Sequence, residues 1–257
     1  MEILNLNYQT FFVFFFLALA LSMKLLAFSV EKIQKRPHNF RFVFLSPLFS
    51  TKSYKSLRDP SLTKIILFLR SCFFGVSMCL YFFSCYEVQP LMSPLLFCYL
   101  LAPGIYLLTL WIGSVTQFLF SFTGIAFIDI HDRPYLSFSL TDFWSRRWNR
   151  WIRDWLNNLT LKTKSVSLVA GVLFSFFLSG LFHEIMFNLP YFLFTGQKHF
   201  GPMMGYFILQ GLGLLFERKF LRQATPLMRR IFMWVMVIGL SPLFIGPPLL
   251  SVIGLNP

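Results

Sequence analysis

The chain has 257 residues, of which 56% are hydrophobic and 13% are charged, whereas soluble domains are about 45–50% apolar and about 25% charged. This composition excludes an ordinary soluble domain and indicates a helical protein that crosses a membrane several times. In a soluble protein the net charge of +13 would favour a nucleic-acid partner. Membrane proteins gather Lys and Arg in their cytosolic loops, so we expect a lipid bilayer and no nucleic acid as the partner here.

Apolar segments of roughly 20 residues, the length that crosses a hydrocarbon core, recur along the chain. Six of them are expected to span the membrane: residues 8–30, 65–86, 95–122, 165–187, 202–216 and 231–253. The first is longer than a signal-peptide core and follows no basic segment, so we expect it to be retained as a helix. Pro242 and the Pro247-Pro248 pair should break the last one, because proline interrupts helical hydrogen bonding.

Basic residues concentrate in every second connection between these segments. Connections 31–64, 129–164 and 217–230 hold 20 of the 23 Lys and Arg residues. Alternating spans put the three connections on one side of the membrane, and the positive-inside rule assigns that side to the cytosol. The expected fold class is therefore all-α: a polytopic transmembrane helical bundle of about six spans, forming one domain. The four cysteines form no C-x-x-C pair, so neither a zinc site nor a disulfide framework is indicated.

Tryptophans recur at +4, +3, +4 along residues 142–156, a spacing that places them on one face of a helix. The four indoles are those of Trp144, Trp148, Trp151 and Trp155. Three arginines fall on the opposite side: Arg146, Arg150 and Arg153. Asn149 lies at the border of the two faces. Since indoles prefer the headgroup level, we expect an amphipathic helix at the cytosolic interface, and a plain juxtamembrane anchor is the alternative.

The fourth apolar segment carries two ionisable residues, His183 and Glu184, which a membrane span seldom tolerates without a function. Ser179 and Gly180 lie one turn before His183, and such small residues leave room for a neighbouring helix or a substrate chain. Glu184 projects roughly 100° away from His183, so it need not touch the imidazole. A neutral imidazole can accept a proton from a hydroxyl near pH 7, and an interhelical hydrogen bond is the alternative role.

Two stretches of the chain resemble the signatures of wax synthases, which belong to the membrane-bound O-acyltransferase (MBOAT) superfamily. The first is D-R-P-Y-L-S-F-S-L-T-D-F-W-S-R-R-W-N at residues 132–149, and the second is F-F-L-S-G-L-F-H-E at residues 176–184. Ser145 stands where the family commonly has glycine. M-K-L-L-A-F-S at residues 23–29 is similar to an upstream helix of plant wax synthases. The resemblance implies a single membrane-embedded acyltransferase domain over residues 1–257, with its signature region at 129–190.

The resemblance also implies an activity, the transfer of a fatty acyl group from acyl-CoA to a long-chain alcohol, giving a wax ester. Related enzymes use a sterol or terpenoid hydroxyl, and a catalytically silent lipid-binding membrane protein is the reading from another class. The family's usual location makes the endoplasmic-reticulum membrane the expected one. Acyl-CoA would be a co-substrate, and no cofactor or metal is expected.

The resemblance implies that His183 is catalytic and that Asn149 lies in the same chamber. His183 would accept the proton of the alcohol as it attacks the thioester, while Asn149 would donate to the oxyanion or orient the alcohol. Arg146, Arg147 and Arg150 would meet the phosphates of CoA, or else remain solvated cytosolic charges. Four further residues are expected to contact substrate: Trp144, Trp148, Ser179 and Glu184.

Overall fold

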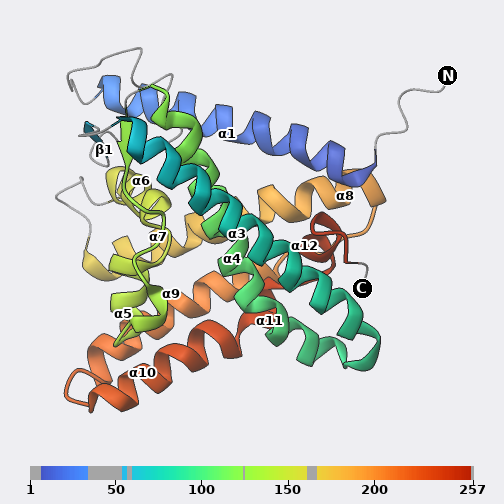
Figure 1. Cartoon of the computed structure of the whole chain (residues 1–257). Coiled ribbons are helices and arrows are strands. Elements are labelled where there is room, and N and C mark those ends of the chain that lie inside the picture. Colours follow the sequence, from blue (N-terminus) through green and yellow to red (C-terminus); the bar gives the residue numbers. More distant parts are fainter. Residues whose placement is uncertain (1–6, 34–53, 57–59, 124, 161–166, 256–257) are drawn as a thin grey trace.

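The structure is a computed structural model that describes residues 7–33, 54–56, 60–123, 125–160 and 167–255 (Figure 1). Its longer helices are α1 (Tyr8–Ile33), α3 (Pro60–Val88), α4 (Pro94–Ser121), α6 (Arg150–Thr160), α7 (Leu168–His183), α9 (Pro202–Phe220) and α10 (Pro226–Trp234). Its short helices are α5 (Leu140–Asp142), α8 (Leu189–Thr195), α11 (Ser241–Phe244) and α12 (Pro247–Val252). Two strands, β1 (Tyr54–Ser56) and β2 (Ile125–Phe127), pair antiparallel, a small addition to the all-α fold that the sequence predicts.

Four helical stretches are long and apolar enough to cross a membrane: Ser61–Leu91, Pro94–Ser121, Leu168–Thr195 and Pro226–Phe244. They confirm a helical, multi-pass membrane protein. The first and fifth expected spans fall in α1 and α9, and the total of six spans stays a prediction. The expected break in the last span is present, because helix α11 ends at Phe244 and α12 begins at Pro247.

Helix starts are encoded by short polar residues followed by proline or an apolar run. Ser93 caps α4 by accepting the N–H of Leu96, at 3.4 Å, and Pro94 follows at the first helical position. Ser167 caps α7 in the same way by accepting the N–H of Ala170, at 3.2 Å. Serine suits this position because its hydroxyl replaces the backbone acceptor that the first turn lacks.

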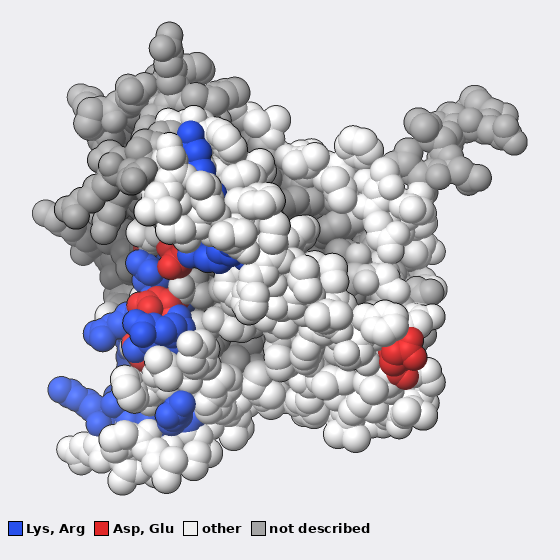
Figure 2. Space-filling model, viewed as in Figure 1, with Lys and Arg blue, Asp and Glu red and all other residues white. Residues whose placement is uncertain are grey.

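Most of the charged residues visible in Figure 2 lie at one end of the bundle. In Figure 1 one end of the bundle holds the start of α1 and helix α12. The second end holds α6 and the turn between α9 and α10. Figure 2 shows Lys and Arg gathered along that second end, while the rest of the visible surface is almost free of charge, apart from an acidic patch near the α3–α4 turn. An alternation of spans predicts this one-sided distribution.

Helix α7 packs directly on α9 through small residues. A Cβ added at Gly180 would lie 2.7 Å from Sδ of Met204 and 3.1 Å from its Cα. One at Gly211 would lie 3.1 Å from the ring of Phe176. Of the two uses expected for the small residues beside His183, the structure therefore shows the neighbouring helix. This close approach sets α9 against the segment that carries His183.

The predicted continuous helix over residues 142–156 is wrong. The chain forms α5, then a π-helical turn at Phe143–Arg147, and it becomes extended at Trp148, where ψ is 136°. Asn149 has φ of 34°, in the left-handed region, and α6 starts afresh at Arg150. The 3/4 spacing of the tryptophans therefore does not correspond to one helical face. Asparagine is among the few residues other than glycine that tolerate this conformation.

Candidate functional site

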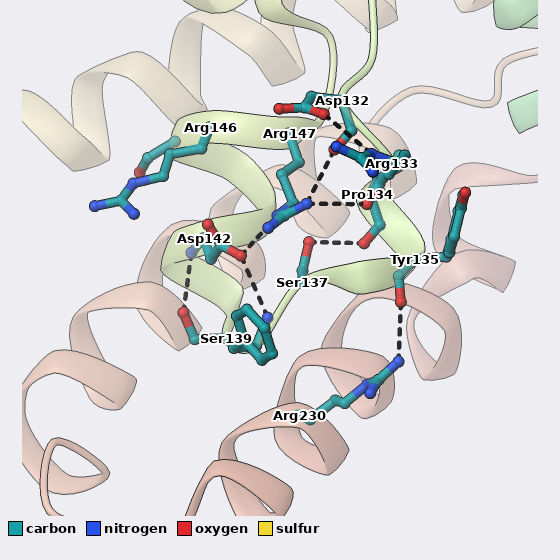
Figure 3. A network of polar contacts seen from close by, with 12 residues as sticks. Asp132, Arg133, Pro134, Tyr135, Ser137, Ser139, Asp142, Arg146, Arg147 and Arg230 are labelled. Atoms are coloured by element: carbon teal, nitrogen blue, oxygen red, sulfur yellow. Dashed lines mark hydrogen bonds and ion pairs between the residues drawn. The ribbon is translucent and has the colours of Figure 1, made fainter.

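Arg147 organises the first signature segment (Figure 3). Its Nε lies 2.8 Å from Oδ2 of Asp142, and its Nη1 donates to the carbonyls of Asp132 and Arg133 at 3.3 and 3.4 Å. The backbone N–H of Asp132 donates in return to the carbonyl of Arg147, at 2.9 Å. Arg133 has φ of 44°, in the left-handed region, and these contacts stabilise the turn that it forms. The guanidinium predicted to meet CoA phosphate is thus already engaged within the fold.

The other arginines of this segment are placed differently. Figure 3 shows the guanidinium of Arg146 directed away from the network around Arg147, and the residue is exposed. Arg150 is half-buried, and its backbone N–H donates to Ile130 O at 2.7 Å. Arg153 pairs with Asp154 at 2.5 Å and donates to the carbonyl of Ser145 at 3.0 Å. Arg146 therefore has the most accessible cationic group of the three predicted phosphate contacts.

The tryptophans face the protein. Trp144 Nε1 donates to Oε1 of Gln210 at 3.1 Å, and Trp151 Nε1 donates to the carbonyl of Ile128 at 2.9 Å. The ring of Trp148 stacks on Phe143, with centroids 5.3 Å apart. These three residues therefore do not share one helical face, and their place at headgroup level stays a prediction. The side chain of Trp155 lies outside the described residues.

Asn149 caps α6. Its Oδ1 accepts the N–H of Ile152 at 3.2 Å, and its own backbone N–H donates to Nδ1 of His131 at 3.1 Å. His131 is only 5% exposed, and its Nε2 lies 2.9 Å from Oγ1 of Thr109. Burial lowers the pKa of His131 to about 3, so the imidazole is neutral at physiological pH.

The sequence analysis missed His131. The available signal was its position: it immediately precedes the first signature and is one of four histidines in the chain. The loop that carries it is tied to the helices by Asp129, whose Oδ1 lies 2.7 Å from Nη2 of Arg70 on α3. Gln117 of α4 donates to the same oxygen at 3.2 Å.

His183 is held in one tautomer by its own helix. Its Nδ1 lies 2.6 Å from the carbonyl oxygen of Ser179, and a carbonyl can only accept, so Nδ1 carries the proton. Nε2 then has a free lone pair, and no described residue hydrogen-bonds to it. Four phenylalanine rings surround the imidazole: Phe182, Phe187, Phe207 and Phe244, with centroids at 5.5, 6.3, 4.4 and 5.3 Å. An oriented acceptor in an apolar cage suits proton abstraction from a hydroxyl.

Glu184 turns away from His183, as its helical position predicts. It is 6% exposed, and its Oε1 accepts the backbone N–H groups of Gly201 and Met204 at 3.0 and 2.9 Å. Its Oε2 accepts from the side chain of Asn188. The carboxylate thus caps the N-terminus of α9, where the helix dipole favours negative charge.

A second buried glutamate does the same for the signature segment. Glu217, on α9, is 1% exposed. It accepts the N–H groups of Leu140 and Thr141 at the start of α5, at 2.7 and 2.9 Å. Glu184 on the π-helical turn after α7 therefore fixes α9, and Glu217 on α9 fixes the segment that leads to Asn149. The two signatures are linked through one helix.

The ring of Phe207 on α9 lies between the two signatures. Its centroid lies 6.0 Å from that of Trp144 and 4.4 Å from that of His183. Asn149 lies further along the first signature, with Trp148 and His131, whose rings are 4.3 Å apart. The structure thus brings Trp144 and Ser179 into the surroundings of His183, while the described contacts include none between Asn149 and His183.

Comparisons with known proteins show which sequences this chain is similar to. Residues 128–209 match the Membrane bound O-acyl transferase family, a region that includes both signatures. The chain is 26% identical over 239 residues to the probable long-chain-alcohol O-fatty-acyltransferase 8 of Arabidopsis thaliana, covering 84% of this chain and 67% of that protein. It is 29% identical over 126 residues to the probable long-chain-alcohol O-fatty-acyltransferase 1 of Arabidopsis thaliana, covering 45% of this chain and 35% of that protein.

A third relative is more similar to this chain, over a shorter stretch. The long-chain-alcohol O-fatty-acyltransferase of Simmondsia chinensis is 37% identical over 91 residues, which is 32% of this chain and 25% of that protein. The matched part of the chain thus spans between a quarter and two thirds of the length of these three relatives. The similarity to long-chain-alcohol O-fatty-acyltransferases, predicted from the two signatures, is confirmed.

Proposed function

We propose, because the chain resembles the membrane-bound O-acyltransferases in both signatures, that it is a membrane O-acyltransferase. It moves a fatty acyl group from acyl-CoA to the hydroxyl of a long-chain alcohol and releases a wax ester and CoA. The observation that carries the proposal is the tautomer of His183, whose Nδ1–H is held by the carbonyl of Ser179 at 2.6 Å. This contact leaves Nε2 as an oriented proton acceptor.

The reaction needs one proton to be moved. As the alcohol oxygen attacks the thioester carbonyl, Nε2 of His183 takes its proton, and the C–S bond breaks once the tetrahedral intermediate collapses. The imidazolium then protonates the departing CoA thiolate, which restores the neutral histidine. The phenylalanines around the imidazole provide an apolar setting that keeps water from competing with the alcohol.

The other predicted site residues take supporting roles in this proposal. Arg146 meets a CoA phosphate, because its guanidinium is exposed and points away from the Arg147 network. Asn149 either donates to the oxyanion or orients the alcohol. Three residues contribute packing contacts to the wall of the proposed substrate chamber: Trp144, Trp148 and Ser179. We assign Arg147 and Glu184 to holding the chamber together, since their charged groups are occupied by the fold.

The proposed topology has six spans, with α1 and α9 added to the four apolar stretches. The basic connections face the cytosol, and the membrane is that of the endoplasmic reticulum. Single cysteines at Gln223 and Lys198, in a background without the four native cysteines, test this. An impermeant thiol reagent should label position 198 in sealed microsomes only after the lumen is opened, and position 223 without opening. Equal labelling of the two positions would contradict six spans.

Microsomes from a host without wax-ester synthesis test the activity. They are given labelled acyl-CoA with fatty alcohols, sterols or terpenoid alcohols, and the products are separated by chain class. Wax esters made by the wild-type chain and lost in His183→Gln support the proposal. Steryl or terpenyl esters alone would show that the acceptor is wrong. No ester with any acceptor, from well-expressed protein, would favour a silent lipid-binding protein.

A further inference from the structure

His131 is a buried imidazole with a defined role for each nitrogen. Nδ1 receives the backbone N–H of Asn149 at 3.1 Å, so it must be unprotonated. Nε2 therefore carries the proton and donates it to Oγ1 of Thr109 at 2.9 Å. The hydroxyl of Thr109 in turn donates within its own helix, to the carbonyl of Ile105 or Tyr106 at 3.0 and 2.9 Å. Helix α4 thus sets the orientation of the ring.

Packing fixes the imidazole further. Its centroid lies 4.3 Å from that of Trp148 and 5.3 Å from that of Tyr106. The ring is therefore clamped between α4 and the first signature, and its Nδ1 has a fixed position relative to Asn149. A rigid acceptor at this point stabilises a backbone conformation that asparagine otherwise adopts only occasionally.

These contacts determine what the side chain of Asn149 can still do. Ile152 N–H is a donor, so the atom that accepts it at 3.2 Å must be Oδ1, which fixes the orientation of the carboxamide. Oδ1 is thereby used as the cap of α6. Among the described residues none accepts a hydrogen bond from Nδ2, which can only donate.

We infer that His131 is a positioning residue, which holds Asn149 so that its carboxamide turns its Nδ2–H donors to the substrate while Oδ1 points to the cap of α6. The inference rests on the proposed acyl transfer. Of the two roles open to Asn149, it selects donation to the oxygen of the thioester carbonyl as negative charge develops there. Accepting the alcohol proton is left to His183, because Oδ1 of Asn149 points to the Ile152 N–H and an amide oxygen is too weakly basic to take a proton.

The test is a double-mutant cycle between positions 131 and 149, measured as steady-state wax-ester formation. His131→Phe keeps a packed ring but removes the acceptor for the Asn149 N–H. His131→Asn restores an acceptor, because its Oδ1 is bonded to Cγ as Nδ1 is in histidine. Thr109→Val removes only the partner of Nε2. His199→Phe is the matched control, since this histidine packs on Tyr191 in the α8–α9 connection, away from Asn149.

His131→Phe should lower kcat about 10–100-fold, by analogy with the loss seen when a partner that orients a metal-binding side chain is removed. His131→Asn should recover most of that loss, Thr109→Val should give a smaller loss, and His199→Phe should leave kcat unchanged. In an Asn149→Ala background, His131→Phe should lower kcat by less than about twofold, because the group it positions is gone. The melting temperature in detergent is measured for every variant.

An equal loss in both backgrounds, or no recovery in His131→Asn, would overturn the inference while leaving the proposed acyl transfer intact. If His131→Phe does not fold, the comparison of Thr109→Val in the two backgrounds decides the same question. No ester from the wild-type chain would overturn both the acyl transfer and the inference that rests on it.

Discussion

Replacing Glu184 by glutamine measures what its buried carboxylate does for α9. The carboxylate makes three charge-assisted hydrogen bonds, and two of them are to the N–H groups of Gly201 and Met204 at the start of α9. Hydrogen bonds to a charged group contribute about 1.5–3 kcal/mol each, and neutral ones about 0.5–1.5 kcal/mol. Glutamine keeps the volume and one acceptor but not the charge. The free energy of unfolding should therefore fall by about 2–3 kcal/mol.

Thermal unfolding of the purified protein in detergent, followed by tryptophan fluorescence, measures this loss. Glu87→Gln is the matched control: Glu87 is exposed near the end of α3, and the change should be within about 0.5 kcal/mol. The KM for the alcohol should stay unchanged in folded Glu184→Gln protein, because Glu184 contacts α9. A variant as stable as the wild type but with a raised KM would refute the capping argument and return Glu184 to substrate binding.

Four further experiments separate catalysis, binding and folding. His183→Gln should lower ester formation about 10²–10⁴-fold at an unchanged melting temperature, and near-full turnover would show that the imidazole is not the base. Arg146→Gln should raise the KM for acyl-CoA at a similar kcat. Arg147→Gln leaves the half-buried carboxylate of Asp142 without its ion-pair partner, so it should lower the free energy of unfolding by about 3 kcal/mol. For His131, burial lowers the folded pKa to about 3, so below pH 6.5 only the unfolded chain takes up the proton. As the pH falls from 7 to 5, wild-type stability should therefore drop by about 2 kcal/mol relative to His131→Asn, and equal slopes in unfolding titrations over this range would contradict the assignment.

The membrane helices were predictable because length and apolarity act locally. Each apolar segment must satisfy its backbone hydrogen bonds within itself, so its helix follows from composition alone. The break in the helix at Trp148 and Asn149 was not predictable, because it depends on a hydrogen-bond acceptor 18 residues earlier, Nδ1 of His131. The tryptophan spacing continues across the break and so indicates a helix where none continues. Only the tolerance of asparagine for positive φ offered a hint.

The candidate site also has residues that the sequence predicted and residues whose roles depend on distant contacts. His183 stood out because an ionisable residue in an apolar span is unusual. The role of Glu184 did not, since its partners Gly201 and Met204 lie 17 and 20 residues downstream. Likewise, the engagement of Arg147 depends on how the chain folds back to place Asp132 and Asp142 around one guanidinium. Residue types predicted the chemistry, but not which charges the fold itself uses.

The cap that Glu217 places on α5 has a consequence for biosynthesis. Leu140 and Thr141 find the acceptor for their N–H groups 77 and 76 residues further along the chain. A ribosome must therefore complete α9 before the signature segment can close its first turn. Until then those N–H groups lack the acceptor that they have in the folded protein, so the segment cannot adopt its final conformation. A nascent chain arrested ahead of Glu217 should consequently be cut by protease near residues 140–141, and one arrested well beyond it should be protected.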